Sequence, residues 1–213
     1  MEDILSRIEH TVLGPETSPA DVRSVLDDAI EYGLRVCVPP SYVSLAAEYA
    51  PQVAISTVIG FPHGNTTTET KAQEARIAVE DGADELDMVC HVGRLKAGDG
   101  EDVKRDIEEV VAATSKPVKV IIETPLLDDM EKHRACKLAA DAGASYVKTA
   151  TGFSDGGATV ADVALMSDYA PVKASGGVGS WESAEAMFDA GAARIGTSSG
   201  DVIAAEYLET NEA

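Results

Sequence analysis

The chain has 213 residues and a formal net charge of −20, with 37 Asp and Glu residues against 17 Lys and Arg. This length suits one sizeable hydrophobic core, so we expect one domain over residues 1–213. The acidic balance excludes a basic surface for nucleic acid, and no apolar run reaches the roughly 20 residues of a membrane helix.

The cysteines and the N-terminus favour a cytoplasmic protein. Cys37, Cys90 and Cys136 are too few and too scattered for a disulfide framework, and "MEDILSRIEH" does not resemble a signal peptide. The acidic residues are spread along the chain, which is typical of a salt-rich source, where salt screens their repulsion. An acidic protein from an ordinary source is the alternative.

Short apolar runs alternate with helical segments along the chain. Ser18 with Asp21, and Thr66 with Glu69, predict capping boxes at two helix starts. Four helical stretches end at a glycine, as expected for left-handed caps. These glycines are Gly33, Gly82, Gly143 and Gly191. The alternation predicts a parallel α/β protein.

Eight of the apolar runs have the length of strands. They are Ile8–Thr11, Leu34–Val38, Val53–Ile59, Glu85–Cys90, Val118–Ile122, Ser145–Thr149, Val172–Ala174 and Arg194–Gly196. Eight strands at roughly 27 residues per unit predict a single (β/α)8 TIM barrel. A doubly wound sheet is the alternative, but the chain has no GxGxxG loop after an early strand.

Side chains in a barrel strand point alternately to the interior and to the surrounding helices. In "ELDMV" the apolar Leu86 and Met88 suit the helices, which leaves Glu85, Asp87 and Val89 for the interior. The polar residues of this strand are therefore expected inside the barrel.

The same alternation places two lysines inside. Tyr146 and Lys148 face inward in "YVKT", and Lys173 and Ser175 face inward in "PVKAS". The two lysines lie on consecutive strands, whose backbones are about 4.8 Å apart. One carboxylate and two lysines are therefore expected to share a cavity.

This grouping favours Schiff-base chemistry. An ammonium beside another has a lowered pKa, and a neutral amine can attack a carbonyl carbon while a carboxylate shuttles protons. Thr149 and Thr151 offer hydroxyls that could orient a substrate near Lys148, whereas Lys173 leads directly into a glycine-rich loop, so Lys148 is the predicted nucleophile and Lys173 its electrostatic partner. A purely structural ion-pair network is the alternative. Lys119 is a third inward candidate, but it lies near the start of its strand and is expected to be structural.

Three glycine-rich loops follow neighbouring strands: "TGF", "ASGGVGS" and "IGTSSGD". Loops after the last barrel strands often bind phosphate through backbone N–H groups and a helix N-terminus. The residues alone therefore predict a Schiff-base enzyme acting on a small phosphorylated carbonyl compound.

Nine blocks, in order, resemble the deoxyribose-phosphate aldolases. They are "IEHTVL", "CVPPSYV", "VIGFPHGNTTTETKAQEA", "GADELDMV", "VGRLKAG", "VKVIIET", "YVKTATGF", "VKASGGV" and "RIGTSSG". The resemblance implies reversible cleavage of 2-deoxy-D-ribose 5-phosphate to acetaldehyde and D-glyceraldehyde 3-phosphate, without metal or organic cofactor. We also expect a homo-oligomer.

The resemblance also implies roles for individual residues. Lys148 would form the Schiff base, Lys173 would tune it, and Asp87 would belong to the proton relay. The implied phosphate contacts are Gly152, Gly176, Gly177, Gly196, Ser198 and Ser199.

Four positions depart from the family pattern: Glu9 replaces Asp, Pro39 and His91 each replace Asn, and Ala150 replaces Ser. Pro39 and His91 are expected near the barrel mouth, with His91 as a polar wall residue, so the acceptor range is left open. Two other functions stay open, namely a Schiff-base aldolase for another sugar phosphate and a non-catalytic sugar-phosphate sensor.

Overall fold

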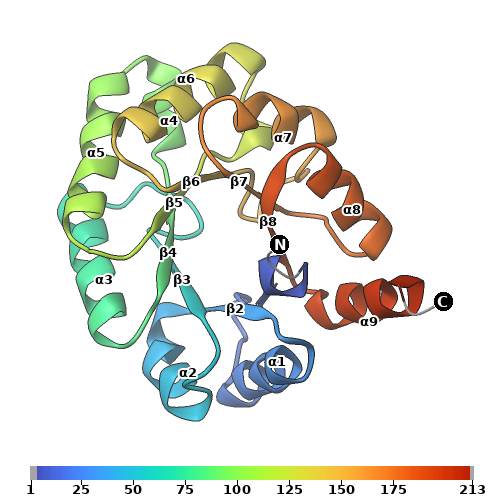
Figure 1. Ribbon diagram of the computed structural model, residues 1–213. Helices are drawn as coiled ribbons and strands as arrows, with labels where there is room; N and C mark the ends of the chain where they lie inside the picture. The colour runs from blue at the N-terminus through green and yellow to red at the C-terminus, as the bar shows by residue number, and fades with distance from the viewer. Residues whose placement is uncertain (1–3, 212–213) are drawn as a thin grey trace.

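Eight parallel strands form a closed barrel in the computed structural model, which describes residues 4–211 (Figure 1). Each strand pairs with the next, and the last pairs with the first. This closure confirms the predicted single (β/α)8 barrel and excludes the doubly wound sheet. The strands are β1 (Ile8–Thr11), β2 (Arg35–Val38), β3 (Ile55–Ile59), β4 (Glu85–Val89), β5 (Val118–Ile121), β6 (Tyr146–Lys148), β7 (Val172–Ser175) and β8 (Ala192–Thr197).

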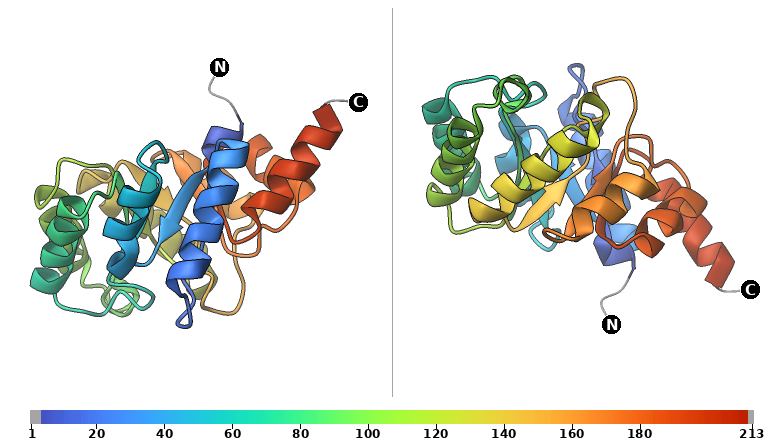
Figure 2. Two further views of the ribbon diagram at one scale, coloured as in Figure 1. Left: turned by 90° about the horizontal axis from the view of Figure 1, so that it is seen from below. Right: turned by 90° about the horizontal axis from the view of Figure 1, so that it is seen from above.

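Helices surround the strands on all sides, as the views of Figure 2 also show. They are α1 (Pro19–Tyr32), α2 (Val43–Tyr49), α3 (Thr68–Glu80), α4 (Val92–Ala97), α5 (Gly100–Ala112), α6 (Asp129–Asp141), α7 (Val160–Ser167), α8 (Trp181–Asp189) and α9 (Gly200–Asn211). Three short 3-10 helices lie at η1 (Leu5–Arg7), η2 (Pro40–Tyr42) and η3 (Thr124–Leu126). Within residues 4–211, no helix is long and apolar enough to cross a bilayer.

The predicted helix ends are mostly confirmed. Ser18 and Asp21 form the expected capping box, and all four predicted glycines have positive φ. The predicted capping box of Thr66 and Glu69 was wrong. The N-cap of α3 is Thr67, whose hydroxyl accepts the N–H of Thr70. Three threonines in a row can each cap a helix, so composition alone does not select the register.

The alternation along the strands separates an apolar shell from a charged interior. Leu86, Met88, Val147 and Val172 are fully buried and belong to the hydrophobic core between strands and helices. The side chains on the other face of these strands include lysines and carboxylates that are also buried. The inside of the barrel is therefore where polar chemistry is concentrated.

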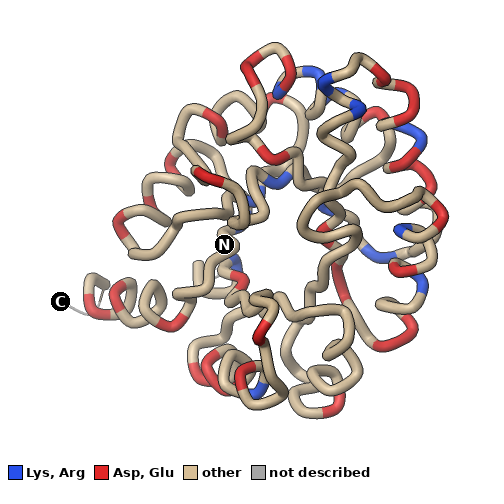
Figure 3. The backbone as a smooth tube through the Cα atoms, turned by 180° about the vertical axis from the view of Figure 1, so that it is seen from behind, with Lys and Arg blue, Asp and Glu red and all other residues tan. Residues whose placement is uncertain are grey.

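Acidic positions are distributed over the helices around the whole barrel, as Figure 3 shows in red. With a net charge of −20, these carboxylates repel one another at low ionic strength. Salt at about 0.1 M shortens the Debye length to about 10 Å, and molar salt to about 3 Å.

We expect the melting temperature and the catalytic activity to be higher in molar potassium chloride than in dilute buffer. Differential scanning calorimetry across a salt series measures the first effect. Sucrose at matched osmolality is the control, because it favours burial without screening charge. Equal stability and activity across the salt series would show that the acidic surface is unrelated to salt.

Candidate active site

Six charged side chains from five strands meet inside the barrel. They are Glu9 (β1), Glu85 and Asp87 (β4), Lys119 (β5), Lys148 (β6) and Lys173 (β7). All six are at least nine-tenths buried. A buried charge is tolerated when it is paired and hydrogen-bonded, and here lysines and carboxylates alternate in space.

Asp87 lies at the centre of this cluster. Its Oδ2 accepts hydrogen bonds from Lys148 Nζ and Lys173 Nζ, each at 2.7 Å. Its Oδ1 accepts a third from Lys119 Nζ at 2.9 Å. Lys148 and Lys173 are register partners on neighbouring strands, as Asp87 and Lys119 are. The structure therefore brings together the carboxylate and two lysines that the alternation places inside.

Two members of the cluster, Glu9 and Lys119, were not expected to contact Asp87 or the lysines. Glu9, considered only as a departure from the family pattern, pairs with Lys173 and lies 3.4 Å from Lys119 Nζ. Lys119 was set apart as structural, yet its ammonium contacts Asp87 and also Glu85 Oε2 at 2.7 Å. Lys119 could have been assigned to the cluster from the sequence, because it faces inward and its strand pairs with the strand of Asp87.

The two lysines that share Asp87 differ in pKa. Burial is the main cause that lowers the pKa of Lys148; the nearby Lys173 charge lowers it further, and Asp87 opposes both. Burial also disfavours the charge of Lys173, but the carboxylates of Asp87 and Glu9 outweigh it and raise the Lys173 pKa. Lys148 therefore gives up its proton more readily than Lys173 does.

Two carboxylates of the cluster, Asp87 and Glu9, remain ionised despite their burial. Burial alone would raise the pKa of Asp87, but the charges of Lys119, Lys148 and Lys173 hold it well below its usual value. In the same way, Lys119 and Lys173 outweigh the burial of Glu9 and lower its pKa to about 2. Asp87 and Glu9 are thus anions that stabilise the ammonium form of the lysines they contact.

A cavity of about 440 Å³ opens next to Lys148. Its walls include all seven residues that the sequence predicts to bind substrate: Thr151, Gly152, Gly176, Gly177, Gly196, Ser198 and Ser199. Lys173 and Asp87 lie behind the cavity and are fully buried, whereas Lys148 is 3% exposed. Of the three lysine amines, the one that a ligand in this cavity can touch directly is that of Lys148.

Glycine is required at Gly177 and Gly196 of the cavity for different physical reasons. A Cβ on Gly177 would meet open space, although its φ of +78° disfavours other residues. A Cβ on Gly196 would approach Lys173 Cε to 2.7 Å. Gly196 therefore leaves room for the Lys173 side chain, while Gly177 leaves room for a ligand.

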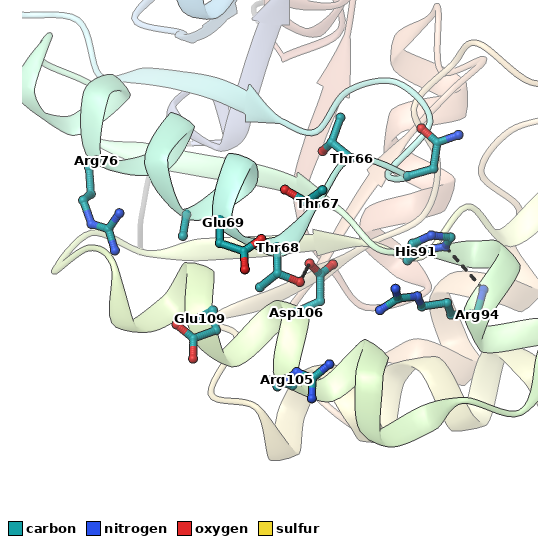
Figure 4. A pocket seen from close by; sticks show the side chains of 12 residues that line it. Thr66, Thr67, Thr68, Glu69, Arg76, His91, Arg94, Arg105, Asp106 and Glu109 are labelled. Atoms are coloured by element: carbon teal, nitrogen blue, oxygen red, sulfur yellow. Dashed lines mark hydrogen bonds between the residues drawn. The ribbon is translucent and has the colours of Figure 1, made fainter.

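A second cavity of about 620 Å³ lies between α3 and α5 (Figure 4). It contains none of the seven predicted binding residues. Two of its arginines are partly neutralised by Asp102. A guanidinium nitrogen of Arg94 lies 3.5 Å from the Asp102 carboxylate, and one of Arg105 lies 2.7 Å from it. The smaller cavity is the candidate active site because it contains an amine with a lowered pKa.

The departures from the family pattern occupy different places. His91 lines the second cavity, where its Nδ1 accepts the N–H of Arg94 at 3.3 Å, and Pro39 lines neither cavity. Pro39 directly follows β2 and His91 lies just after β4, at the strand ends where the barrel mouth was expected, but neither residue lines the Lys148 cavity. Ala150 is fully buried, and its carbonyl accepts the Ser175 hydroxyl.

Across residues 4–211, no group of three or more His, Cys, Asp or Glu side chains is arranged to hold a metal ion. The expectation that the chain works without a metal or organic cofactor stays a prediction.

Comparison with known proteins finds similar chains in one family. The model of the DeoC/LacD family aldolases matches residues 8–203. A deoxyribose-phosphate aldolase of Haloarcula marismortui is 61% identical over 97% of this chain and 89% of its own length. One from Halobacterium salinarum is 60% identical over 98% of this chain and 99% of its own length.

Solved structures show the same fold. The aldolase QR15 superposes with a TM-score of 0.95 at 39% identity, over 100% of this chain and 99% of its own. The deoxyribose phosphate aldolase from Aeropyrum pernix, described as tetrameric, superposes with a TM-score of 0.89 at 35% identity, over 97% and 92%.

The fold and these similarities define the class of protein as a lyase of the aldolase type built on a (β/α)8 barrel. Within that class, the chain belongs to the DeoC/LacD aldolase family.

Proposed function

We propose that this chain reversibly cleaves 2-deoxy-D-ribose 5-phosphate to acetaldehyde and D-glyceraldehyde 3-phosphate through a Schiff base on Lys148. The observation that carries the proposal is the Lys148 amine, which has a lowered pKa and lines a cavity of glycine-rich loops. The names of the similar aldolases supply the substrate.

The chemistry begins when the neutral Lys148 amine attacks the C1 carbonyl of the open-chain sugar. Loss of water from this adduct gives an imine, whose nitrogen is protonated so that it can accept the electrons of the C2–C3 bond. Removal of the proton from the C3 hydroxyl then breaks the C2–C3 bond, releases D-glyceraldehyde 3-phosphate and leaves an enamine on Lys148. Protonation at C2 and attack by water on the resulting imine release acetaldehyde and restore the amine.

In this proposal, Asp87 and Lys173 act behind the nucleophile. Asp87, hydrogen-bonded to both amines, passes protons to and from Lys148 through its Oδ2. Lys173 stays an ammonium because Asp87 and Glu9 raise its pKa, and its charge favours the neutral form of Lys148.

Backbone groups are proposed to bind the phosphate. Among the residues that line the cavity, Lys148 is the one cation, and it is assigned to the carbonyl end of the sugar. The phosphate would lie against Gly152, Gly176, Gly177, Gly196, Ser198 and Ser199. Backbone N–H groups in glycine-rich turns commonly bind phosphate in this way.

Substitution Gly177→Leu should raise KM for 2-deoxyribose 5-phosphate far more than for unphosphorylated 2-deoxyribose, because the new side chain enters the cavity. Gly33→Leu is the matched control: Gly33 has φ +73° and open space, but lies outside the cavity. It should lower stability with little change in KM for either substrate. An equal effect of Gly177→Leu on both substrates would count against this phosphate site.

A retro-aldol assay tests the proposed function. Release of D-glyceraldehyde 3-phosphate is followed with a coupled dehydrogenase, and the reverse reaction is run with acetaldehyde or dihydroxyacetone as donor. Turnover with acetaldehyde supports the proposal. A preference for dihydroxyacetone would instead indicate another Schiff-base aldolase, and substrate binding without turnover would indicate a sensor.

We further propose that the chain forms a homo-oligomer in the cytoplasm. The tetramer described for the Aeropyrum pernix enzyme supports the first part. Three buried, unpaired cysteines favour a reducing compartment. Light scattering of the purified protein measures the oligomeric state.

A further inference from the structure

Glu123 has an unusual backbone conformation directly after β5. Its φ of 59° and ψ of 62° lie in the left-handed region. Among residues 4–211, it is the one residue other than glycine with positive φ. Glycine adopts this conformation without steric cost, whereas a residue with a Cβ does not. The presence of glutamate therefore suggests that its side chain does something that glycine could not.

The Glu123 carboxylate is buried and is bound by one loop. The residue is 4% exposed and makes no ion pair within the described part of the chain. Its two oxygens lie 3.2 and 3.3 Å from the backbone nitrogen of Thr151, which donates to them. Oε1 also accepts the hydroxyl of Ser154 at 2.9 Å. A buried carboxylate needs such donors, so its environment is satisfied only while this loop keeps its shape.

This loop joins β6 to α7 and forms one wall of the candidate active site. Thr151, Gly152 and Phe153 all line the cavity of Lys148. Farther along, the N–H of Ala158 donates to the carbonyl of Gly176 at 2.9 Å. This bond fixes the other end of the loop against the loop that follows β7. Glu123 fixes the end that is nearer to Lys148.

We propose that Glu123 is a positioning residue that sets the preference of this site for phosphorylated substrates. It holds Thr151 and Gly152 in the conformation that receives the phosphate, without touching the reacting atoms itself. This inference rests on the proposed function, since it assigns the phosphate to that wall of the cavity.

Substitution Glu123→Gly tests the carboxylate without backbone strain, because glycine adopts this φ readily. We expect KM for 2-deoxyribose 5-phosphate to rise by about tenfold, the effect of losing hydrogen bonds to a charged group. The value of kcat and the activity on unphosphorylated 2-deoxyribose should stay within about twofold, a change of under 0.5 kcal/mol. Glu123→Gln keeps the shape of the side chain and one acceptor oxygen, so its KM should lie between those of the wild type and Glu123→Gly.

A matched control is available in Glu74 of α3. This carboxylate also accepts a backbone N–H from a loop that follows a strand, that of Gly60 at 2.7 Å. Glu74 lies outside the Lys148 cavity. Glu74→Ala should therefore lower the melting temperature while leaving the ratio of kcat/KM for the two substrates unchanged.

Titration calorimetry with inorganic phosphate provides a readout that does not depend on turnover. The inference predicts that wild type binds phosphate and that Glu123→Gly binds it about tenfold more weakly. Equal phosphate affinity in the two proteins, or no binding by wild type, would overturn the inference. The inference would also be overturned if Glu123→Gly lost kcat/KM equally for 2-deoxyribose 5-phosphate and for 2-deoxyribose. If wild type binds phosphate but does not cleave the sugar phosphate, the proposed function fails and the calorimetry still decides the role of Glu123.

Discussion

Substitution Lys148→Ala is expected to abolish cleavage of 2-deoxyribose 5-phosphate. Without the amine no imine forms, and the C2–C3 bond loses the electron sink that its cleavage requires. A loss of about 10⁴-fold or more in kcat corresponds to roughly 5.4 kcal/mol of activation free energy. The fold should survive, because alanine removes one of three lysines that contact Asp87. Coupled detection of D-glyceraldehyde 3-phosphate measures the loss.

Lys71 offers a control for the general effect of removing a buried lysine. Its Nζ is fully buried and pairs with Asp106 at 2.6 Å, outside the cavity of Lys148. Lys71→Met should cost stability, in the range of about 3–5 kcal/mol for a broken buried pair. Folded Lys71→Met should keep its turnover. If Lys148→Ala retained more than a small fraction of wild-type kcat, the Schiff base could not lie on this residue.

Substitution Lys173→Leu is expected to move the acidic limb of the pH–rate profile to higher pH. Lys173 carries a positive charge that helps to lower the Lys148 pKa. Removing that charge raises the Lys148 pKa, so a larger share of Lys148 is protonated and unreactive at neutral pH. Each unit of movement corresponds to about 1.4 kcal/mol. The pH dependence of kcat/KM between pH 5 and 10 measures the shift.

Lys119→Leu is the matched control for this profile. It also removes a lysine that binds Asp87, but through the other carboxylate oxygen. Its effect on the acidic limb should be smaller than that of Lys173→Leu. A limb that stays in place in Lys173→Leu, or moves to lower pH, would contradict the proposed electrostatic role of Lys173.

The barrel itself could be predicted because its signals are local and repeated. Short apolar runs mark the strands, and positive-φ glycines such as Gly33 and Gly143 mark several of the helix ends. Boundaries were less certain: β3 begins at Ile55 rather than Val53, because the Val53 N–H is used in a turn with Ala50.

The charged cluster could be predicted only in part. Period-two alternation placed Asp87, Lys148 and Lys173 inside, and the register of neighbouring strands then brought them together. Lys119 was recognised as facing inward but was not assigned to the cluster, although it is the register partner of Asp87. Glu9 was missed because its contacts with Lys173 and Lys119 depend on side-chain reach between strands that are not neighbours, which alternation does not give. The sequence reasoning also attributed the lowered Lys148 pKa to Lys173, whereas burial is the larger cause.

The conformation of Glu123 and the position of His91 depend on three-dimensional packing and are not predicted by any sequence motif. Glu123 sits in the block "VKVIIET", which reads as a strand end, and its left-handed backbone becomes apparent only in the structure. His91 follows β4 as expected, but it lines the cavity between α3 and α5, beside Arg94. Sequence patterns predict that a residue follows a strand, but they do not say into which cavity its side chain points.

The central claim is that Lys148, and not Lys173, forms the Schiff base. Borohydride reduction in the presence of acetaldehyde traps an imine as a stable secondary amine, and peptide mass spectrometry locates it. We predict an ethyl adduct on Lys148 in wild type, none at this position in Lys148→Ala, and slower adduct formation at neutral pH in Lys173→Leu. An adduct on Lys173 in the wild-type protein, with Lys148 unmodified, would contradict the account.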